Sequence, residues 1–132
     1  CGRCTQERER KMSEMKLPHD HGRDSARYLE HMPTQEGFAA VAEVYKLLDD
    51  ASRCRIFWLL CHCEECVTDL SCMMDMSSPA LSHHLRLLKE AGLIVSRRSG
   101  KEVYYKAAST PAARTLHDAM EALMAIACPT DL

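Results

Sequence analysis

The chain has 132 residues, 46% of them hydrophobic and 27% charged, which is ordinary for a soluble globular protein. This length allows one folded domain with an appendage and is too short for two domains. The longest apolar run, residues 56–60, is far too short to cross a membrane, and no apolar leader segment is visible at the start. We therefore expect a cytoplasmic protein with no membrane partner.

The net charge of −2 excludes a nonspecific polycation, but the charges are unevenly distributed. Residues 77–106 hold six basic residues against two acidic ones, whereas residues 37–76 hold three basic residues against seven acidic ones. One positive segment in an otherwise acidic chain is expected where a single face of a protein meets a polyanion such as DNA. A solvated surface with locally uneven charge is the alternative.

The N-terminal residues 1–36 differ in character from the rest of the chain. They are polar, balanced in charge and interrupted by Pro18, Gly22 and Pro33, and so predict a flexible arm with room for a short helix over residues 23–32. The folded domain is expected over residues 37–132. Apolar residues at three- and four-residue spacing from Phe38 to Leu48 predict its first helix.

The next three helices are predicted from their caps and apolar faces. The segment 50–52 provides a cap for a second helix over residues 53–62, and a short third helix is expected over residues 66–74. A serine cap and a proline in the first turn then begin a fourth helix after residue 77. This helix has an inward row of leucines at 81, 85 and 88, and Gly92 is expected to end it.

A β-hairpin and a last helix complete the predicted domain. Two runs rich in Val, Ile and Tyr, residues 93–98 and 102–107, flank Ser99-Gly100, a dipeptide typical of a hairpin turn. Pro111 opens a helix expected to continue to about Cys128. The order α-α-α-α-β-β-α predicts a mainly α winged helix-turn-helix fold.

The fourth helix and the hairpin carry polar and basic side chains suited to DNA. Hydroxyls and imidazoles early in a helix can approach base edges in the major groove, and arginine can pair bidentately with guanine. A basic hairpin tip fits neighbouring phosphates or the minor groove. A polar helix face and a solvated turn are the purely structural alternative. The predicted DNA contacts are Ser77, Ser78, Ser82, His83, His84, Arg86, Lys89, Arg97, Arg98 and Lys101.

Four motifs within residues 42–107, about half of the chain, carry a family resemblance. They are LLDDASR (47–53), ECVTDL (65–70), LSHHLRLLKEAGLI (81–94) and VYY (103–105). In this order they resemble the start of helix two, the metal-binding segment, the recognition helix and the second wing strand of the ArsR/SmtB metalloregulatory repressors. The resemblance implies a homodimer, built on the first and last helices, that places two recognition helices in successive major grooves of double-stranded operator DNA. It also implies release from DNA when an inducer binds.

The same resemblance implies a metal site at the third helix. Cys66 corresponds to the first cysteine of the metal-binding segment and Asp69 to a carboxylate used in some zinc sensors. Thr68 stands where cadmium and arsenic sensors carry a second cysteine, so the chain departs from that pattern. Counted without gaps from Cys66, His19 falls at a ligand of the zinc-sensor arm, and His21 lies two residues further on.

The candidate ligands allow two donor sets. Eight cysteines without an export signal favour reduced thiols, some of them metal ligands, over a disulfide framework. Cys61, Cys63 and Cys66 would suit a soft ion such as arsenite, cadmium or lead. Cys66 and Asp69 with the two arm histidines would suit zinc. No organic cofactor is indicated.

The family's second metal site, on the last helix, is not expected in this chain. Its gapless positions hold Ser109, Pro111, Ala122 and Ala125, which cannot bind a metal ion there. His117 and Glu121 lie one helical turn apart and form a weaker candidate pair. Any metal is therefore expected near the third helix.

We accordingly predict a transcriptional repressor released from its operator by zinc, cadmium, lead or arsenite. A thiol-based redox or persulfide sensor of the same fold is the main alternative, and a metal-storage module without a DNA function is another. An enzyme is not expected, because the sequence shows no nucleophile with a supporting base and no phosphate-binding glycine loop.

Overall fold

The computed structural model describes residues 18–19 and 25–127, in two compact units that divide between Val41 and Ala42. Helix α2 (Ser25–Glu30) and the start of α3 (Gln35–Leu47) belong to the first unit. A short helix was predicted in this region and is confirmed. Within the described residues, no helix combines the length and the apolar character that crossing a lipid bilayer requires.

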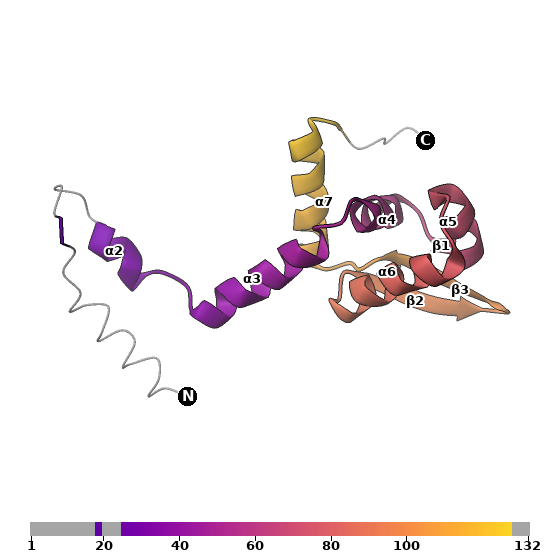
Figure 1. Ribbon diagram of the computed structural model, residues 1–132, viewed down its shortest axis with the longest axis horizontal. Helices are drawn as coiled ribbons and strands as arrows, with labels where there is room; N and C mark the ends of the chain where they lie inside the picture. The colour runs from indigo at the N-terminus through magenta and orange to yellow at the C-terminus, as the bar shows by residue number, and fades with distance from the viewer. Residues whose placement is uncertain (1–17, 20–24, 128–132) are drawn as a thin grey trace. The chain divides into compact units, whose positions relative to one another are not determined.

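The second unit has the predicted order of a winged helix-turn-helix, which confirms the fold class (Figure 1). After α3 the elements are α4 (Ala51–His62), β1 (Glu65–Cys66), α5 (Val67–Met74), α6 (Ser78–Glu90), β2 (Ile94–Ser99), β3 (Glu102–Ala107) and α7 (Pro111–Met124). Only β1 has no counterpart among the predicted elements of this unit.

The three strands form one antiparallel sheet in the order β1-β3-β2. Cys66 of β1 lies opposite Tyr104 of β3. In the hairpin Ser99 pairs with Glu102, so the turn is Gly100-Lys101, and the predicted Ser99-Gly100 turn is wrong by one residue. Gly100 has a φ of +64°, as the first residue of a type II′ turn requires.

Side-chain caps and left-handed residues set the helix ends. Ser77 Oγ accepts from the backbone N–H of Ala80 at the start of α6, and Thr110 Oγ1 accepts from that of Ala113 at the start of α7. Helix α6 ends before Gly92, as predicted. Helix α7 ends at Met124, because Ala125 takes a φ of +54°, so its predicted continuation to Cys128 is wrong.

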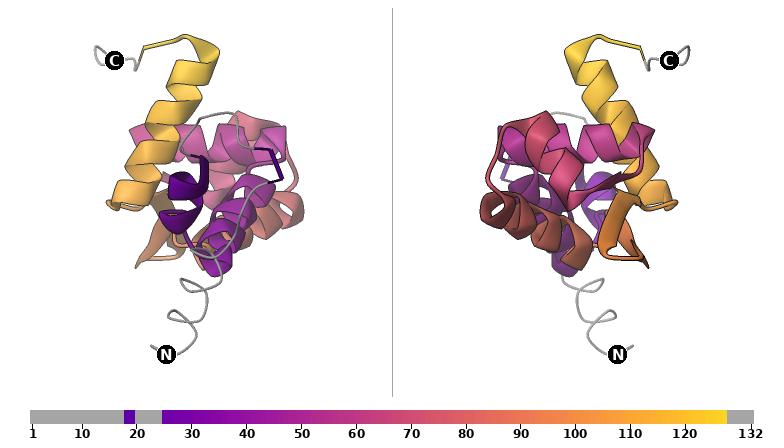
Figure 2. Two further views of the ribbon diagram at one scale, coloured as in Figure 1. Left: turned by 90° about the vertical axis from the view of Figure 1, so that its left-hand side faces the viewer. Right: turned by 90° about the vertical axis from the view of Figure 1, so that its right-hand side faces the viewer.

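The core of the second unit is formed mainly by the apolar faces of α4, α5 and α6 and by the first residues of the hairpin. Burying a large aliphatic side chain contributes about 1.5–3 kcal/mol, so these faces fix how the helices pack. Figure 2 shows α7 crossing α4, which it contacts. The largest fully buried side chains are Phe57, Ile56, Leu60, Leu70, Leu81, Leu85, Leu88 and Ile94.

Candidate nucleic-acid interface and metal-ligating residues

Helices α5 and α6 form a helix-turn-helix with a tightly bonded turn. Asp75 takes a left-handed conformation with a φ of +50°. The backbone N–H of Met76 donates to the Ser71 carbonyl over 3.1 Å, and the Ser71 hydroxyl donates to the Met76 carbonyl. Ser77 then caps α6. The turn therefore fixes where the first residues of α6 point.

Helix α6 has an apolar inner face and a polar outer face. Leu81, Leu85 and Leu88 are 0–1% exposed and pack into the core. Arg86 is 64% exposed, and its Nη2 lies 3.2 Å from His83 Nδ1. The outer face thus offers hydroxyls at its start and cations towards its end. The predicted DNA contacts that are exposed on this face are Ser78, Ser82, His83, Arg86 and Lys89.

His84 lies apart from the other predicted DNA contacts. Position 84 is three residues after Leu81 and four before Leu88, so it falls beside the buried row and its side chain is half-buried. Its Nδ1 lies 3.3 Å from Nη1 of Arg53 on α4. Arg53 in turn pairs with Asp50, whose carboxyl pKa is lowered by the backbone hydrogen bond from Arg53. His84 is therefore placed to hold α6 against α4.

The hairpin, or wing, carries the three predicted cations Arg97, Arg98 and Lys101, of which Arg97 is paired with a carboxylate. Arg98 and Lys101 are exposed near its tip. Arg97 Nε donates to Glu64 Oε1 over 2.9 Å, and its Cζ lies 4.8 Å from the centre of the Tyr104 ring. The hydrogen bond from Arg97 lowers the pKa of the Glu64 carboxyl. Sequence reasoning missed Glu64, because the two partners are 33 positions apart.

The predicted thiol ligands lie at the end of α4 and in β1. Cys61 and Cys63 are half-buried, and Cys66 is 6% exposed. Burial raises the pKa of the Cys63 thiol, which donates to the Leu59 carbonyl over 3.4 Å. Asp69 is exposed in the first turn of α5. His19 is exposed in the other unit, and His21 lies outside the described residues.

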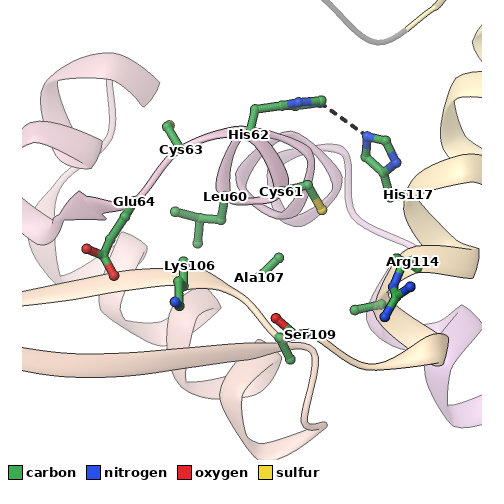
Figure 3. A pocket seen from close by; sticks show the side chains of 12 residues that line it. Leu60, Cys61, His62, Cys63, Glu64, Lys106, Ala107, Ser109, Arg114 and His117 are labelled. Atoms are coloured by element: carbon green, nitrogen blue, oxygen red, sulfur yellow. Dashed lines mark hydrogen bonds between the residues drawn. The ribbon is translucent and has the colours of Figure 1, made fainter. Parts of the chain in front are cut away.

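A pocket of about 500 Å³ opens beside the end of α4 (Figure 3). Cys61 of α4 and Cys63, directly after that helix, line one side of it, and Lys106 of β3 and Arg114 of α7 also line it. Cys66 is not among the lining residues. The structure therefore brings two of the three predicted thiols to one pocket with two cations.

A different set of ligating side chains converges in the described part of the chain. His62, His117 and Glu121 form its only group of three or more His, Cys, Asp or Glu residues whose ligand atoms all lie within 4.8 Å of one another. Figure 3 shows His62 on α4 facing His117 on α7. Sequence reasoning noted the pair on α7 but missed His62, 55 residues before His117.

A helix-turn-helix whose second helix exposes a polar and basic face, beside a hairpin with a basic tip, defines a winged-helix DNA-binding regulator. Residues 50–96 match the family model described as bacterial regulatory protein, arsR family. The chain is also 36% identical over 98 residues to the biofilm growth-associated repressor of Agrobacterium fabrum, covering 74% of this chain and 80% of that protein. The chain belongs to the arsR family, which consists of transcriptional regulators rather than enzymes.

Two further similarities bear on function. The chain is 41% identical over 70 residues to the arsenical resistance operon repressor of Escherichia coli K12, covering 52% of this chain and 60% of that one. The matches span only 52–60% of the length of three such curated relatives. A homodimeric winged helix-turn-helix domain from Mycobacterium bovis, described as a possible ArsR-family regulator, matches with a TM-score of 0.59 and 30% identity. That match covers 71% of this chain and 90% of the other.

Proposed function

We propose that this protein is a transcriptional repressor that binds double-stranded operator DNA as a homodimer and is released by a thiophilic metal or metalloid ion. The observation that carries the proposal is the exposed polar row of α6, held outward by its buried leucines and flanked by the basic wing. Such a helix fits the major groove, and a bidentate arginine–guanine contact contributes about 1–3 kcal/mol of discrimination between bases.

Exposed apolar side chains support the homodimer. Tyr45 on α3 is 67% exposed, and Leu123 and Met124 on α7 are 88% and 52% exposed. Leu123 and Met124 line a groove of about 570 Å³, whose other lining side chains, from α4, α5 and the end of α7, are mostly apolar. Contiguous exposed apolar surface commonly marks a protein interface. We assign this surface to a second copy of the chain, because the similar domain from Mycobacterium bovis is described as homodimeric.

The donor chemistry supports a soft ion as inducer. Cys61 and Cys63 line one pocket, and Cys66 is buried in β1, the strand that pairs with the wing strand β3. Thiolates favour cadmium, lead and arsenite, whereas a set of Cys66, Asp69, His19 and His21 would favour zinc. The Escherichia coli relative is named for arsenical resistance. Inducer and operator must weaken each other's binding by the same factor, typically about 5- to 150-fold.

DNA binding is tested with the region upstream of the protein's own gene, by fluorescence anisotropy at several salt concentrations. We expect tight, salt-dependent binding that Arg86→Ala weakens by about 1–3 kcal/mol, because the lost guanidinium contacts a base. Arg27→Ala, an exposed arginine on α2, is the matched control and should bind as the wild type does. Equal affinity for operator and unrelated DNA would refute the repressor assignment.

Induction is tested by adding zinc, cadmium, lead or arsenite to the preformed complex. We expect at least one ion to release the DNA, and Cys66→Ser to bind DNA but lose this response. Cys72→Ser is the control, since Cys72 is exposed on α5 and is not a predicted ligand. No effect of any of the four ions would remove the metal part of the proposal. A specific disulfide that abolishes DNA binding would instead favour thiol oxidation.

A further inference from the structure

We propose that His62, His117 and Glu121 bind a divalent cation of the zinc class within one protomer, at a site separate from the predicted thiol ligands. His62 is the last residue of α4, and the other two lie one turn apart on α7. The site goes beyond the proposed function, because it involves neither the predicted thiol ligands Cys61, Cys63 and Cys66 nor the outer face of α6.

The spacing of the ligand atoms fits a tetrahedral cation. His117 Nε2 lies 2.9 Å from Glu121 Oε1 and 3.2 Å from His62 Nε2, and His62 Nε2 lies 3.7 Å from Glu121 Oε1. Zinc bonds to nitrogen and oxygen are about 2.0–2.2 Å long, which places two tetrahedral ligand atoms about 3.4 Å apart. The three observed separations lie on both sides of this value. Small side-chain movements would therefore complete the geometry.

The environment prepares His117 as a ligand. Its Nδ1 lies 3.1 Å from a carboxylate oxygen of Asp118. A carboxylate on one ring nitrogen keeps the proton there and leaves the lone pair of the other nitrogen for a metal, as in carboxylate–histidine–zinc triads. The other ring nitrogen of His117, Nε2, is directed at His62 and Glu121.

The Glu121 carboxylate supplies a buried negative charge. Its side chain is 12% exposed, and its buried Oε1 accepts no well-formed hydrogen bond from the described residues. A buried anionic oxygen is costly unless a positive charge compensates it. A divalent cation between the three residues provides that charge. A protonated imidazole beside Glu121 is the competing account, and it predicts no metal affinity.

The site can be reached from solvent. His62 and His117 both line the pocket of about 500 Å³ shown in Figure 3. Three protein ligands leave a fourth tetrahedral position open for a water molecule or another donor from this pocket. On its other side the His62 ring packs against Trp58, with ring centres 4.3 Å apart, which restricts the orientation of the imidazole.

A cation here would join two helices that have different neighbours. Helix α4 contacts α6 and holds His84 through Arg53, whereas α7 ends in exposed apolar residues. A metal that cross-links α4 and α7 would fix the angle between these two helices. It would thereby fix the position of α6, which packs on α4, relative to the exposed apolar end of α7. Binding to the folded state alone would also raise the stability of the protein.

The test compares zinc stoichiometry and affinity in full-length variants by native mass spectrometry and competition with a chelator. We expect Glu121→Gln and His117→Gln each to lose one bound zinc per protomer, whereas Cys66→Ser keeps it. Glu43→Gln and His31→Gln are matched controls, since Glu43 is exposed on α3 and His31 is exposed between α2 and α3. Asp118→Asn should weaken binding about 10- to 100-fold, because it removes the partner that orients His117.

Cobalt(II) substitution of the wild type provides a second readout that does not depend on how the variants fold. We expect tetrahedral d–d bands without sulfur-to-cobalt charge transfer for this site. The proposal is overturned if thiolate-bound cobalt alone is seen, or if Glu121→Gln binds zinc as Glu43→Gln does. Failure of the thiol inducer site would appear separately, as a normal response in Cys66→Ser, and would leave this result unaffected.

Discussion

Helices α6 and α7 are built alike and differ in what they present to their surroundings. Each begins with a hydroxyl cap and a proline in its first turn, and each is followed by a left-handed residue, Gly92 two positions after α6 and Ala125 directly after α7. The outer face of α6 carries His83 and Arg86, whereas the end of α7 exposes Leu123 and Met124. Similar capping thus sets where both helices begin and end, while their exposed side chains differ, polar and basic on α6 and apolar at the end of α7.

The largest expected effect comes from exchanging a buried leucine for alanine. Leu85 on α6 is 1% exposed, so Leu85→Ala should lower the free energy of unfolding by about 2–5 kcal/mol. Leu123→Ala on α7 removes the same atoms from a side chain that is 88% exposed. It should act through association, by shifting dimer towards monomer as the protein is diluted.

Urea unfolding measures the first effect and sedimentation equilibrium the second. If Leu123→Ala leaves the dimer dissociation constant unchanged, the end of α7 is not part of the dimer surface. If Leu85→Ala is as stable as the wild type, the inner face of α6 does not anchor it.

Substitutions at the left-handed residues after α6 and α7 should change the free energy of unfolding by smaller amounts, and in opposite directions. A Cβ on Gly92 would meet no atom within 4 Å, so Gly92→Ala tests only its φ of +75° and should destabilise the protein by about 1 kcal/mol. Ala125 has a φ of +54° without being glycine, so Ala125→Gly should stabilise it by about 1 kcal/mol. Thermal unfolding of the two variants measures both stability changes. Shifts of the same sign would contradict the assignment of strain to these residues.

The smallest effect concerns the paired cation of the wing. Glu64→Gln releases Arg97 from its carboxylate partner, so DNA affinity should rise by less than about tenfold, and the slope of log K against log salt should steepen by about 0.9. Glu102→Gln is the control, since it removes an exposed acid from the wing without touching Arg97. Equal slopes in the two variants would show that the pairing with Glu64 does not withhold Arg97 from DNA.

Most of the fold could be predicted from the sequence because its helices carry strong local signals. Periodic leucines, hydroxyl caps and Gly92 define α6 without reference to the rest of the chain. Where the local signal is absent the prediction fails. Ala125 ends α7 although alanine favours helix, so the predicted helix ran on too far. Strand β1 is two residues long and shows no alternation that could reveal it.

Residues of the candidate site were likewise predicted where a local pattern places them and missed where a distant partner does. The outer face of α6 follows from helical periodicity, so its exposed residues were found in advance. His84 belongs to the same helix, but its position between two buried leucines turns it towards Arg53. Glu64 and His62 act through partners 33 and 55 residues away, and no pattern in one sequence reports such distances. Tertiary packing alone brings these side chains together.

The pairing of β1 with β3 has a mechanical consequence. The backbone of Cys66 is a neighbour of Tyr104 in the sheet, and Tyr104 in turn lies opposite Arg97 on the outer strand of the wing. Cys66 therefore lies in a strand that is paired directly with the wing hairpin. If the inducer binds at Cys66, as proposed, a displacement of β1 would reach both wing strands through backbone pairing, with no intervening side chains.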